Sequence, residues 1–411
     1  MKYTDVVFLT KLIPEQLRAQ VDRLSSENLQ EAASALQWNV YRGLCENTNC
    51  PIRLFNVLPL GSFPRYYRHP FVKSSSFLTD CCADNRNLGF CNIRMIRKLS
   101  QPGRVFCALK KWCRQGTEPK FLFVYTLDAG FLRSVSKLKK YCPELKVCAV
   151  VADLPDMISL SANQAGLIRR FTQDSAKKSY SLLNCIDFFV LLTEQMAFRM
   201  QIKKPYCVME GIAQPSEDST ASVEAGDGIK TIFYSGTLHR QFGILNLLEA
   251  FRGIKAPNYR LMICGAGDAQ AEVEAAAKQD SRIRFPGILP REEVLRYQSS
   301  ATVLVNPRQN IGEYVRYSFP SKTMEYLASG RPFVAYRLDG IPKEYDPYIF
   351  YVSDNSVETL RDRLTEVCES SNSAEVIDRC TRAKQFVTEE KNAKKQTAVI
   401  LKMLRSQDVE F

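Results

Sequence analysis

Short runs of β-branched and aromatic residues alternate with helical stretches along almost the whole sequence. In the first half such runs lie at residues 5–9, 52–58, 121–126, 146–151 and 187–192, with helical patterns at 14–37 and 130–140. The pattern restarts in the second half, with runs at residues 231–234, 259–264, 283–285, 302–306, 332–336 and 349–352. Strands that alternate with helices pair in parallel, so the sequence predicts an α/β fold.

The segment 214–228 separates these two patterns. It is rich in Ser, Asp, Glu and Gly and has no apolar periodicity, which is typical of a linker. We therefore expect two doubly wound, Rossmann-like domains, 1–213 and 229–389, with a ligand cleft between them at the carboxyl ends of both sets of strands. The stretch 373–408 has a helical period, and we expect the C-terminal helix 390–411 to join the first domain.

The charge balance restricts the partners of the chain. With 56 Lys and Arg against 44 Asp and Glu, the formal net charge is +12, which suits a sugar diphosphate, an anionic membrane surface or nucleic acid. No zinc-finger, helix-turn-helix or RNA-binding motif accompanies this charge, so we do not expect a nucleic-acid partner. No apolar run reaches the roughly 18 residues of a membrane span, and we expect a cytoplasmic protein.

The fourteen cysteines are expected to remain thiols in a chain of this size. Cys148, Cys207 and Cys264 have the character of small core residues. The cysteines at 45–50 and 81–91 allow a zinc site in principle, but neither of the two histidines lies near them in the sequence. We therefore predict no metal site.

The segment 313–330, EYVRYSFPSKTMEYLASG, has the features of a short helix that begins at an anion site. Pro320 suits the first position of a helix because its missing N–H is not needed there, and Gly330 marks the helix end. The first turn leaves the N–H groups of residues 321–323 without helical partners, ready to hold an anion.

Charged residues around this helix complete a pattern for a nucleoside diphosphate. Arg316 and Lys322 add positive charge beside the N–H groups. Glu325 lies one turn inside, where its carboxylate can accept two hydrogen bonds from a ribose diol. An ordinary capped surface helix explains the segment equally well, so both interpretations stay open at this point.

Two further turns follow predicted strands in the same half. Residues 231–243 combine a strand, a turn containing Gly236 and the start of a helix, and Arg240 there can face a phosphate. The turn with Gly265 and Gly267 also follows a strand, although a lone Gly-x-Gly often marks tight packing only. Three such turns at strand ends favour the anion-site interpretation.

Residues 231–340 resemble the donor domain of the GT-B glycosyltransferases, specifically the large retaining family called group 1 or family 4. The similarity lies in YSGTL…FGILNLLEAF, LMICGAGD, IRFPGILPREEVLRYQSSATVLVNPR and EYVRYSFPSKTMEYLASGRPFV, in this order. The last phrase is similar to the branch that builds bacterial capsule and exopolysaccharide. The first half fits more loosely, through VVFLT, VVADLPD, FFVLLTEQMA and YCVMEGI.

The resemblance implies a GT-B fold and a nucleotide-sugar donor, most simply a UDP-sugar, with no further cofactor and no metal. It implies that Glu325 binds the ribose, that the 318–322 backbone and Arg240 surround the diphosphate, and that the loop 287–289 faces the base. The implied donor-binding residues are Gly236, Thr237, Arg240, Gly287, Ile288, Arg316, Ser318, Ser321, Lys322 and Glu325. The donor sugar would keep its anomeric configuration, and the leaving diphosphate would take the acceptor proton.

Departures from the family pattern concern sugar recognition and catalysis. The first of the family's two glutamates would fall at Tyr317, and the nearest carboxylate is Glu313. The family's donor-facing histidine is Ala152, just before Asp153. Asp153 and Glu313 are therefore the candidate catalytic residues, although Asp153 can equally well just end its strand. The Arg and Lys that usually hold the diphosphate are absent from their positions.

The loop 61–69 is a candidate acceptor site. It follows a predicted strand and mixes aromatic and basic residues, and its Arg65 and Arg68 can hold a pyrophosphate or a sugar of the acceptor. Solvated surface is the alternative interpretation of such a loop.

The segment 94–114 contains seven basic residues and no acidic one. On a helix, Val105, Leu109 and Trp112 share one face, and Lys110, Lys111 and Arg114 lie elsewhere. Such a helix can lie on an anionic leaflet with Trp112 inserted, or it can bury its apolar face in the domain core.

Together these features predict a glycosyltransferase that moves a hexosyl unit onto a glycan, with a lipid-linked glycan as the expected acceptor, at the inner membrane face. Two alternatives stay open. One is a degenerate GT-B protein that binds a nucleotide or a partner without turnover. The other, a nucleotide-sugar epimerase, is disfavoured because its acid–base chemistry needs histidines and the chain has two.

Overall fold

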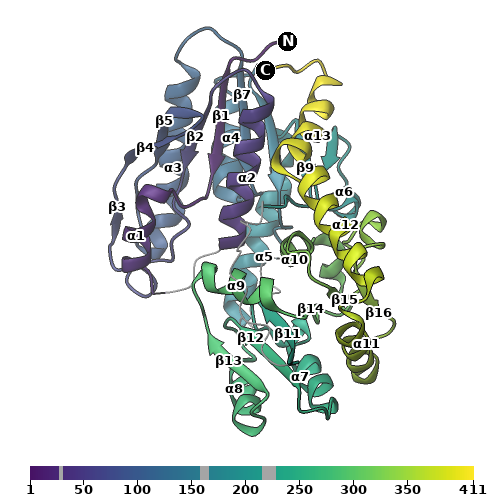
Figure 1. Cartoon of the computed structure of the whole chain (residues 1–411). Helices are drawn as coiled ribbons and strands as arrows, with labels where there is room; N and C mark the ends of the chain where they lie inside the picture. The colour runs from purple at the N-terminus through teal and green to yellow at the C-terminus, as the bar shows by residue number, and fades with distance from the viewer. Residues whose placement is uncertain (27–30, 158–165, 215–227) are drawn as a thin grey trace. The chain divides into compact units, whose positions relative to one another are not determined.

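The computed structural model describes the chain except residues 27–30, 158–165 and 215–227, so most of the predicted linker 214–228 lies outside the described residues. The chain divides into two compact units, which are Met1–Ile212 with Ala393–Phe411, and Ala213–Asn392 (Figure 1).

The described part of the first unit contains an eight-stranded sheet in the order β10-β9-β8-β7-β1-β2-β5-β4. Its strands are β1 (Asp5–Thr10), β2 (Ile52–Asn56), β4 (Ser75–Thr79), β5 (Cys82–Asn87), β7 (Lys120–Tyr125), β8 (Lys146–Val151), β9 (Phe188–Leu191) and β10 (Tyr206–Val208). All neighbours pair in parallel except β4 with β5. A separate antiparallel pair joins β3 (Phe71–Val72) to β6 (Phe90–Cys91).

Helices connect these strands, as the alternating sequence pattern predicts. They are α1 (Glu15–Leu24), α2 (Glu31–Asn47), α3 (Arg94–Cys113), α4 (Ala129–Lys139), α5 (Gly166–Ser181), α6 (Glu194–Met200) and α13 (Ala393–Arg405), with the short 3₁₀ turn η1 (Leu183–Cys185). The central strands β1, β7 and β8 are buried almost throughout. Strands covered on both faces need continuous apolar runs, which explains why these three are the clearest strands in the sequence.

The second unit has a parallel sheet in the order β13-β12-β11-β14-β15-β16. Its described strands are β11 (Lys230–Ser235), β12 (Tyr259–Cys264), β13 (Ile283–Gly287), β14 (Val303–Asn306), β15 (Phe333–Tyr336) and β16 (Phe350–Val352). Its helices are α7 (Ile244–Gly253), α8 (Gln270–Gln279), α9 (Arg291–Ser300), α10 (Ser321–Ala328), α11 (Val357–Ser370) and α12 (Ala374–Glu390), with 3₁₀ turns η2 (Arg240–Phe242), η3 (Glu313–Tyr317) and η4 (Lys343–Tyr345). The first strand in the sequence, β11, lies in the middle of the sheet. The strands β12 and β13 follow on one side of it and β14, β15 and β16 on the other, so the sheet is doubly wound.

Two helical predictions differ from the structure. The predicted helix 14–37 consists of α1 and α2, because the chain turns to an extended conformation at Ser25. The predicted C-terminal stretch 373–408 is also two helices. Of these, α12 packs on α10 in the second unit, and α13 packs along α2 in the first. Gly43 permits this second contact, since a Cβ there would stand 2.2 Å from the Ala393 carbonyl oxygen.

Strand β5 has a sequence, CADNRN, that does not indicate a strand. It is held by side chains rather than by an apolar pattern. Asn85 is buried and its Oδ1 accepts a hydrogen bond from the Leu54 N–H at 2.8 Å. Asn87 is also buried, and its Oδ1 accepts from the Asn56 amide at 3.2 Å. Buried amides with satisfied hydrogen bonds thus replace the apolar contacts that strand patterns rely on.

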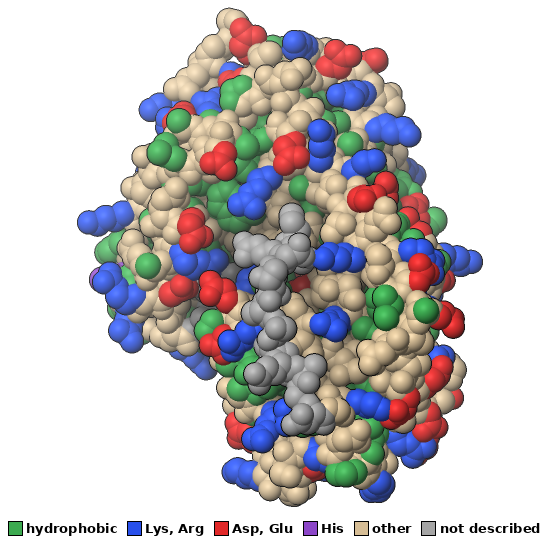
Figure 2. Space-filling view, viewed as in Figure 1, with side chains coloured by type: hydrophobic (Ala, Val, Ile, Leu, Met, Phe, Trp, Pro, Cys, Tyr) green, Lys and Arg blue, Asp and Glu red, His purple; other side chains and the backbone are tan. Residues whose placement is uncertain are grey.

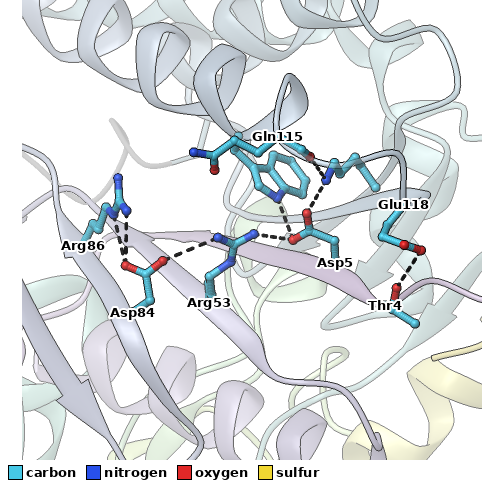
Figure 3. A network of polar contacts seen from close by, with 9 residues as sticks. Thr4, Asp5, Arg53, Asp84, Arg86, Gln115 and Glu118 are labelled. Carbon is cyan, nitrogen blue, oxygen red and sulfur yellow. Dashed lines mark hydrogen bonds and ion pairs between the residues drawn. The ribbon is translucent and has the colours of Figure 1, made fainter.

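Trp112 is a core residue, so the predicted insertion of its ring into a membrane is wrong. Its side chain is 1% exposed, and its indole N–H donates to Asp5 Oδ1 at 2.8 Å. Asp5 also forms ion pairs with Arg53 and Lys120 (Figure 3). This network ties the end of α3 to β1, β2 and β7, and the helix buries its apolar face as the alternative interpretation of segment 94–114 expected.

Asp5 should contribute to stability in a pH-dependent way. Burial raises the pKa of its carboxyl, but hydrogen bonds from Lys120 and Trp112 and the charge of Arg53 lower the pKa more, and the net pKa lies below the usual value. Because the folded-state pKa is the lower one, the stabilisation is complete above the unfolded value of about 3.9 and is lost as the pH falls through the folded value.

We expect Asp5→Asn to lower the free energy of unfolding by about 3 kcal/mol at pH 7, because the cation of Lys120 then lacks its counter-charge. The difference between parent and variant should shrink below about pH 4. Urea unfolding at pH 7 and pH 3 measures both values. An equal difference at the two pH values would show that the carboxylate charge is not what stabilises this region.

Candidate active site

The order of strands in the second unit creates a switch point between β11 and β14. The connections from these neighbours leave toward opposite sides of the sheet, and ligands of doubly wound sheets bind at such a point, outside the carboxyl ends of the strands. The turn with Gly236 and Thr237 follows β11, and Pro307 and Arg308 follow β14. The predicted anion-binding turns therefore belong to one edge of one sheet.

Backbone segments approach each other closely at this edge. Gly265 has a φ of +136°, and a Cβ there would stand 1.9 Å from the Gly236 carbonyl oxygen. Gly243 has a φ of +78°, and a Cβ there would stand 2.0 Å from the Pro307 carbonyl oxygen. Only glycine fits both places. The Gly-x-Gly turn, a weak signal in the sequence, follows β12, and its Gly265 thus allows this turn to pack directly against the turn after β11.

Helix α10 begins at Ser321, one residue later than predicted, with Pro320 as the residue just before its first turn. A second detail of the prediction is wrong. The Thr323 N–H donates to the Pro320 carbonyl at 2.9 Å, so it is not available to an anion. The N–H groups of Ser321 and Lys322 remain the candidates of that turn.

Lys322 links α10 to the end of β11. Its ammonium nitrogen lies 3.0 and 3.2 Å from the two carboxylate oxygens of Glu325 and 3.1 Å from Ser235 Oγ. The Tyr326 hydroxyl accepts a hydrogen bond from the Ser235 N–H at 3.0 Å, and Tyr326 is fully buried. The residues predicted for ribose and for diphosphate are therefore adjacent, half-buried and paired with each other.

The other two predicted diphosphate cations lie in more exposed ion pairs. The Arg240 side chain is 50% exposed and pairs with Glu272 of α8. The Arg316 side chain is 60% exposed, and its Nε lies 3.0 Å from Asp339. A diphosphate would have to compete with a carboxylate for either cation.

Arg308 is a cation at this edge that the sequence analysis missed. Its guanidinium donates to Ser318 Oγ at 2.8 Å and stacks on the rings of Tyr314, at 4.7 Å, and Phe242, at 5.3 Å. Its position directly after β14, at the switch point, is the signal that would have identified it. Ser318, a predicted backbone contact of the diphosphate, is thus tied to a half-buried cation.

The remaining predicted donor residues lie in loops of the same unit. Gly287 ends β13, and its carbonyl accepts from the Gly265 N–H at 2.8 Å, while Ile288 is 59% exposed. The Thr237 carbonyl accepts from the Tyr234 hydroxyl at 2.9 Å. Glu313 is exposed on η3 and accepts from the Tyr317 hydroxyl at 3.1 Å. Glu313, the carboxylate nearest to the position of the family's first glutamate, is thus hydrogen-bonded to Tyr317, the residue that occupies this position.

In the first unit, Asp153 follows β8 and is exposed. Burial raises the pKa of Tyr125 at the end of β7, and the negative charge of Asp153 raises this pKa further. Arg65 and Arg68 are exposed in the loop after β2, and the Arg65 guanidinium lies 4.9 Å from the ring centre of Tyr66.

A second switch point, between β1 and β7, carries a pair that the sequence analysis also missed. Lys11 Nζ lies 2.7 Å from Asp128 Oδ2, and Asp128 caps α4 through the N–H groups of Gly130 and Phe131. Thr126, beside them, has a φ of +66°, which a β-branched residue rarely adopts. Strained backbone of this kind clusters at ligand sites.

Among the residues that the structure describes, no three His, Cys, Asp or Glu side chains gather as metal ligands. In that same part of the chain, no helix combines the length and the apolar character that crossing a bilayer requires.

Residues 229–370 match the family described as "Glycosyl transferases group 1". No curated protein matches the sequence significantly. The whole chain is similar in fold to many solved structures. Three examples, each at low sequence identity, show the extent of the similarity. Sucrose-phosphate synthase from Thermosynechococcus elongatus has a TM-score of 0.66 at 14% identity, covering 98% of this chain and 99% of that one.

The second is the α,α-trehalose-phosphate synthase (UDP-forming) from Burkholderia xenovorans in complex with glucose-6-phosphate, with a TM-score of 0.64 at 13% identity and coverage of 98% and 100%. The third is the pneumococcal O-GlcNAc transferase GtfA in complex with UDP and GlcNAc, with a TM-score of 0.58 at 11% identity and coverage of 98% and 99%. Residues 229–370 are therefore similar to the group 1 glycosyl transferases, and the two Rossmann-like units have the fold of the GT-B glycosyltransferases.

Proposed function

We propose that this protein is a retaining glycosyltransferase that moves a hexosyl unit from a nucleotide sugar to a glycan. The observation that carries the proposal is the position of Lys322 and Glu325, side by side at the switch point of the domain that matches the family. A nucleoside diphosphate needs a cation and backbone N–H groups for its phosphates and a carboxylate for its ribose diol. All of these lie within the first turns of α10.

Binding of the donor should exchange partners at this pair. In the free protein Lys322 neutralises Glu325. A diphosphate brings a larger negative charge to the same ammonium group, which releases the Glu325 carboxylate to accept hydrogen bonds from the ribose. Arg308, which donates to Ser318, would supply a second half-buried cation to the phosphates. Arg240 and Arg316 would add to this positive charge only if their ion pairs with Glu272 and Asp339 were broken.

A UDP-sugar is the donor that the relatives favour. The trehalose-phosphate synthase is named as UDP-forming, and the pneumococcal transferase binds UDP in its structure. We propose that the base lies against Gly287 and Ile288, the exposed end of β13.

We propose a reaction without a metal or other cofactor. Cleavage of the sugar–phosphate bond develops negative charge on the diphosphate, which Lys322, Arg308 and the start of α10 can stabilise in place of a metal ion. In a retaining transfer the leaving diphosphate can take the proton of the acceptor hydroxyl. Glu313 is proposed to contact the donor sugar in place of the missing glutamate, and Asp153 to contact the sugar or the acceptor.

For the acceptor we propose a lipid-linked glycan of capsule or exopolysaccharide synthesis, used at the cytoplasmic face of a membrane. Arg65 and Arg68 suit its phosphates, and Lys11 at the switch point of the first unit is a further candidate.

One observation favours a second candidate function. Glu325 is already paired and Tyr317 replaces a family glutamate, which would also fit a protein that binds nucleotide without turnover.

Glu325→Gln should weaken UDP binding by about 1–3 kcal/mol, because a neutral amide makes weaker hydrogen bonds to the ribose hydroxyls. Isothermal titration calorimetry with UDP measures this, and circular dichroism confirms the fold. Unchanged affinity in the folded variant would mean that Glu325 is purely structural.

Lys322→Met and Arg308→Met should each weaken binding of UDP much more than binding of uridine, because only UDP carries the charge that these cations meet. Arg240→Met and Arg316→Met should show the same selectivity with smaller losses, since both cations are engaged elsewhere. Arg284, exposed on β13, supplies the control Arg284→Met. Equal losses for UDP and uridine would contradict the proposed position of the diphosphate.

Incubation with a panel of nucleotide sugars tests turnover itself. We expect slow hydrolysis of one of them to free sugar, which persists in EDTA, and release of the sugar in the donor's anomeric form by early NMR spectra. Nucleotide binding without hydrolysis or transfer would favour the second candidate, and an inverted product would refute retention.

A further inference from the structure

The positive charge of the chain is concentrated in one segment of the first unit. Residues 47–117 contain twelve Lys and Arg and two Asp, a net charge of +10 against +12 for the whole chain. No acidic residue occurs from Asn85 to Thr117. On the face shown in Figure 2, cationic and anionic side chains are interspersed, so the excess is not visible there as a single patch.

Helix α3 lies in this segment, and its apolar residues are exposed before Pro102 and buried after it. After it, Val105, Leu109 and Trp112 form the stripe that packs into the core, with exposures of 0%, 0% and 1%. Pro102 has no N–H, and so interrupts the hydrogen bonding of the helix. Its carbonyl accepts from Ser134 Oγ at 2.8 Å, which fixes α4 at this point of the helix.

Before Pro102, the helix exposes its apolar side chains instead of burying them. Met95, Ile96 and Leu99 are 73%, 48% and 72% exposed, and Ile93, just before the helix, is 37% exposed. At about 100° per residue, Leu99 and Ile96 lie about 120° and about 180° around the helix from Val105, off the stripe that packs into the core. Met95 lies only about 80° from Val105, but it belongs to the first turn of the helix, before Pro102, and is exposed there as well.

The neighbouring strand pair adds an aromatic ring. Phe71 of β3 is 66% exposed and pairs with Cys91 of β6. The Ser100 hydroxyl of α3 accepts a hydrogen bond from the Cys91 N–H at 3.1 Å and donates one to the Cys91 carbonyl at 3.0 Å. We refer to Phe71, Ile93, Met95, Ile96 and Leu99 as the α3 surface.

We propose that the α3 surface is a docking site for an anionic lipid leaflet. Exposed Arg94 lies between Ile93 and Met95, and exposed Lys73 follows Phe71 by two residues. Cations that can bind headgroup phosphates therefore accompany apolar side chains that can enter the acyl region. A second copy of this chain is a poor occupant, because it would bring two segments of net charge +10 together. This docking goes beyond sugar transfer, and lipid binding can be measured without any nucleotide.

Vesicle co-sedimentation of the full chain tests the proposal. The vesicles contain phosphatidylcholine with or without phosphatidylglycerol. The parent should bind only those with phosphatidylglycerol, and more weakly at high salt. Met95→Ser with Ile96→Ser and Leu99→Ser should bind at least about tenfold more weakly, because its large apolar side chains no longer enter the acyl region. Lys73→Gln with Arg94→Gln should lose about tenfold at low salt.

Two matched controls should bind as the parent does. Ile311→Ser with Ile377→Ser removes apolar side chains of similar exposure from the second unit, 57% and 53% exposed. Lys203→Gln with Lys402→Gln removes two exposed charges from the first unit. The melting temperature of the triple serine variant should stay within a few degrees of the parent, because it alters exposed positions only.

Three outcomes would overturn the proposal. The first is a parent that does not bind anionic vesicles even at low salt. The second is a triple serine variant that binds them as tightly as the parent. The third is a parent whose oligomeric state depends on the α3 surface while its lipid binding does not. Normal UDP binding in the triple serine variant keeps this test separate from the test of the proposed function.

Discussion

The ammonium group of Lys322 connects the parts on which the candidate site depends. It joins the first turn of α10 to the end of β11 and neutralises a carboxylate that would otherwise be half-buried without a counter-charge. Closely packed glycine turns behind it leave little freedom for the surrounding backbone. Because a diphosphate is a stronger partner for this cation than a single carboxylate, the same contact that stabilises the free site can be exchanged when a ligand binds.

The parallel α/β architecture could be predicted from the sequence because its signal is strong and local. Buried parallel strands such as β1, β7 and β8 need continuous apolar runs, and α10 needs a proline at its start and a glycine at its end. Residues whose place depends on neighbours far away in the chain could not be predicted. Arg308 follows the predicted strand 302–306, but its contact with Phe242 depends on β14 lying beside β11, and the Lys11–Asp128 pair depends on two strands that lie more than a hundred residues apart.

Amphipathic patterns in α3 show why burial is harder to predict than helicity. The stripe with Trp112 has the spacing of a membrane-binding face as well as that of a core face. Its burial involves partners far away in the sequence, such as Asp5, which accepts from the indole N–H and is itself paired with Arg53 and Lys120. The first turns of the same helix carry Leu99 and Ile96, about a third and about a half of a turn away from Val105, and both are left exposed. We propose that the two units thus separate two anionic ligands, with nucleotide at α10 and lipid at α3.

A crystal structure of the complex with UDP would show whether the Lys322–Glu325 pair opens for the nucleotide. We expect that Lys322 Nζ leaves Glu325 and lies within about 3 Å of a phosphate oxygen, with the Glu325 carboxylate on the ribose hydroxyls. UDP bound away from the β11–β14 switch point, or bound there with the Lys322–Glu325 pair unchanged, would contradict it.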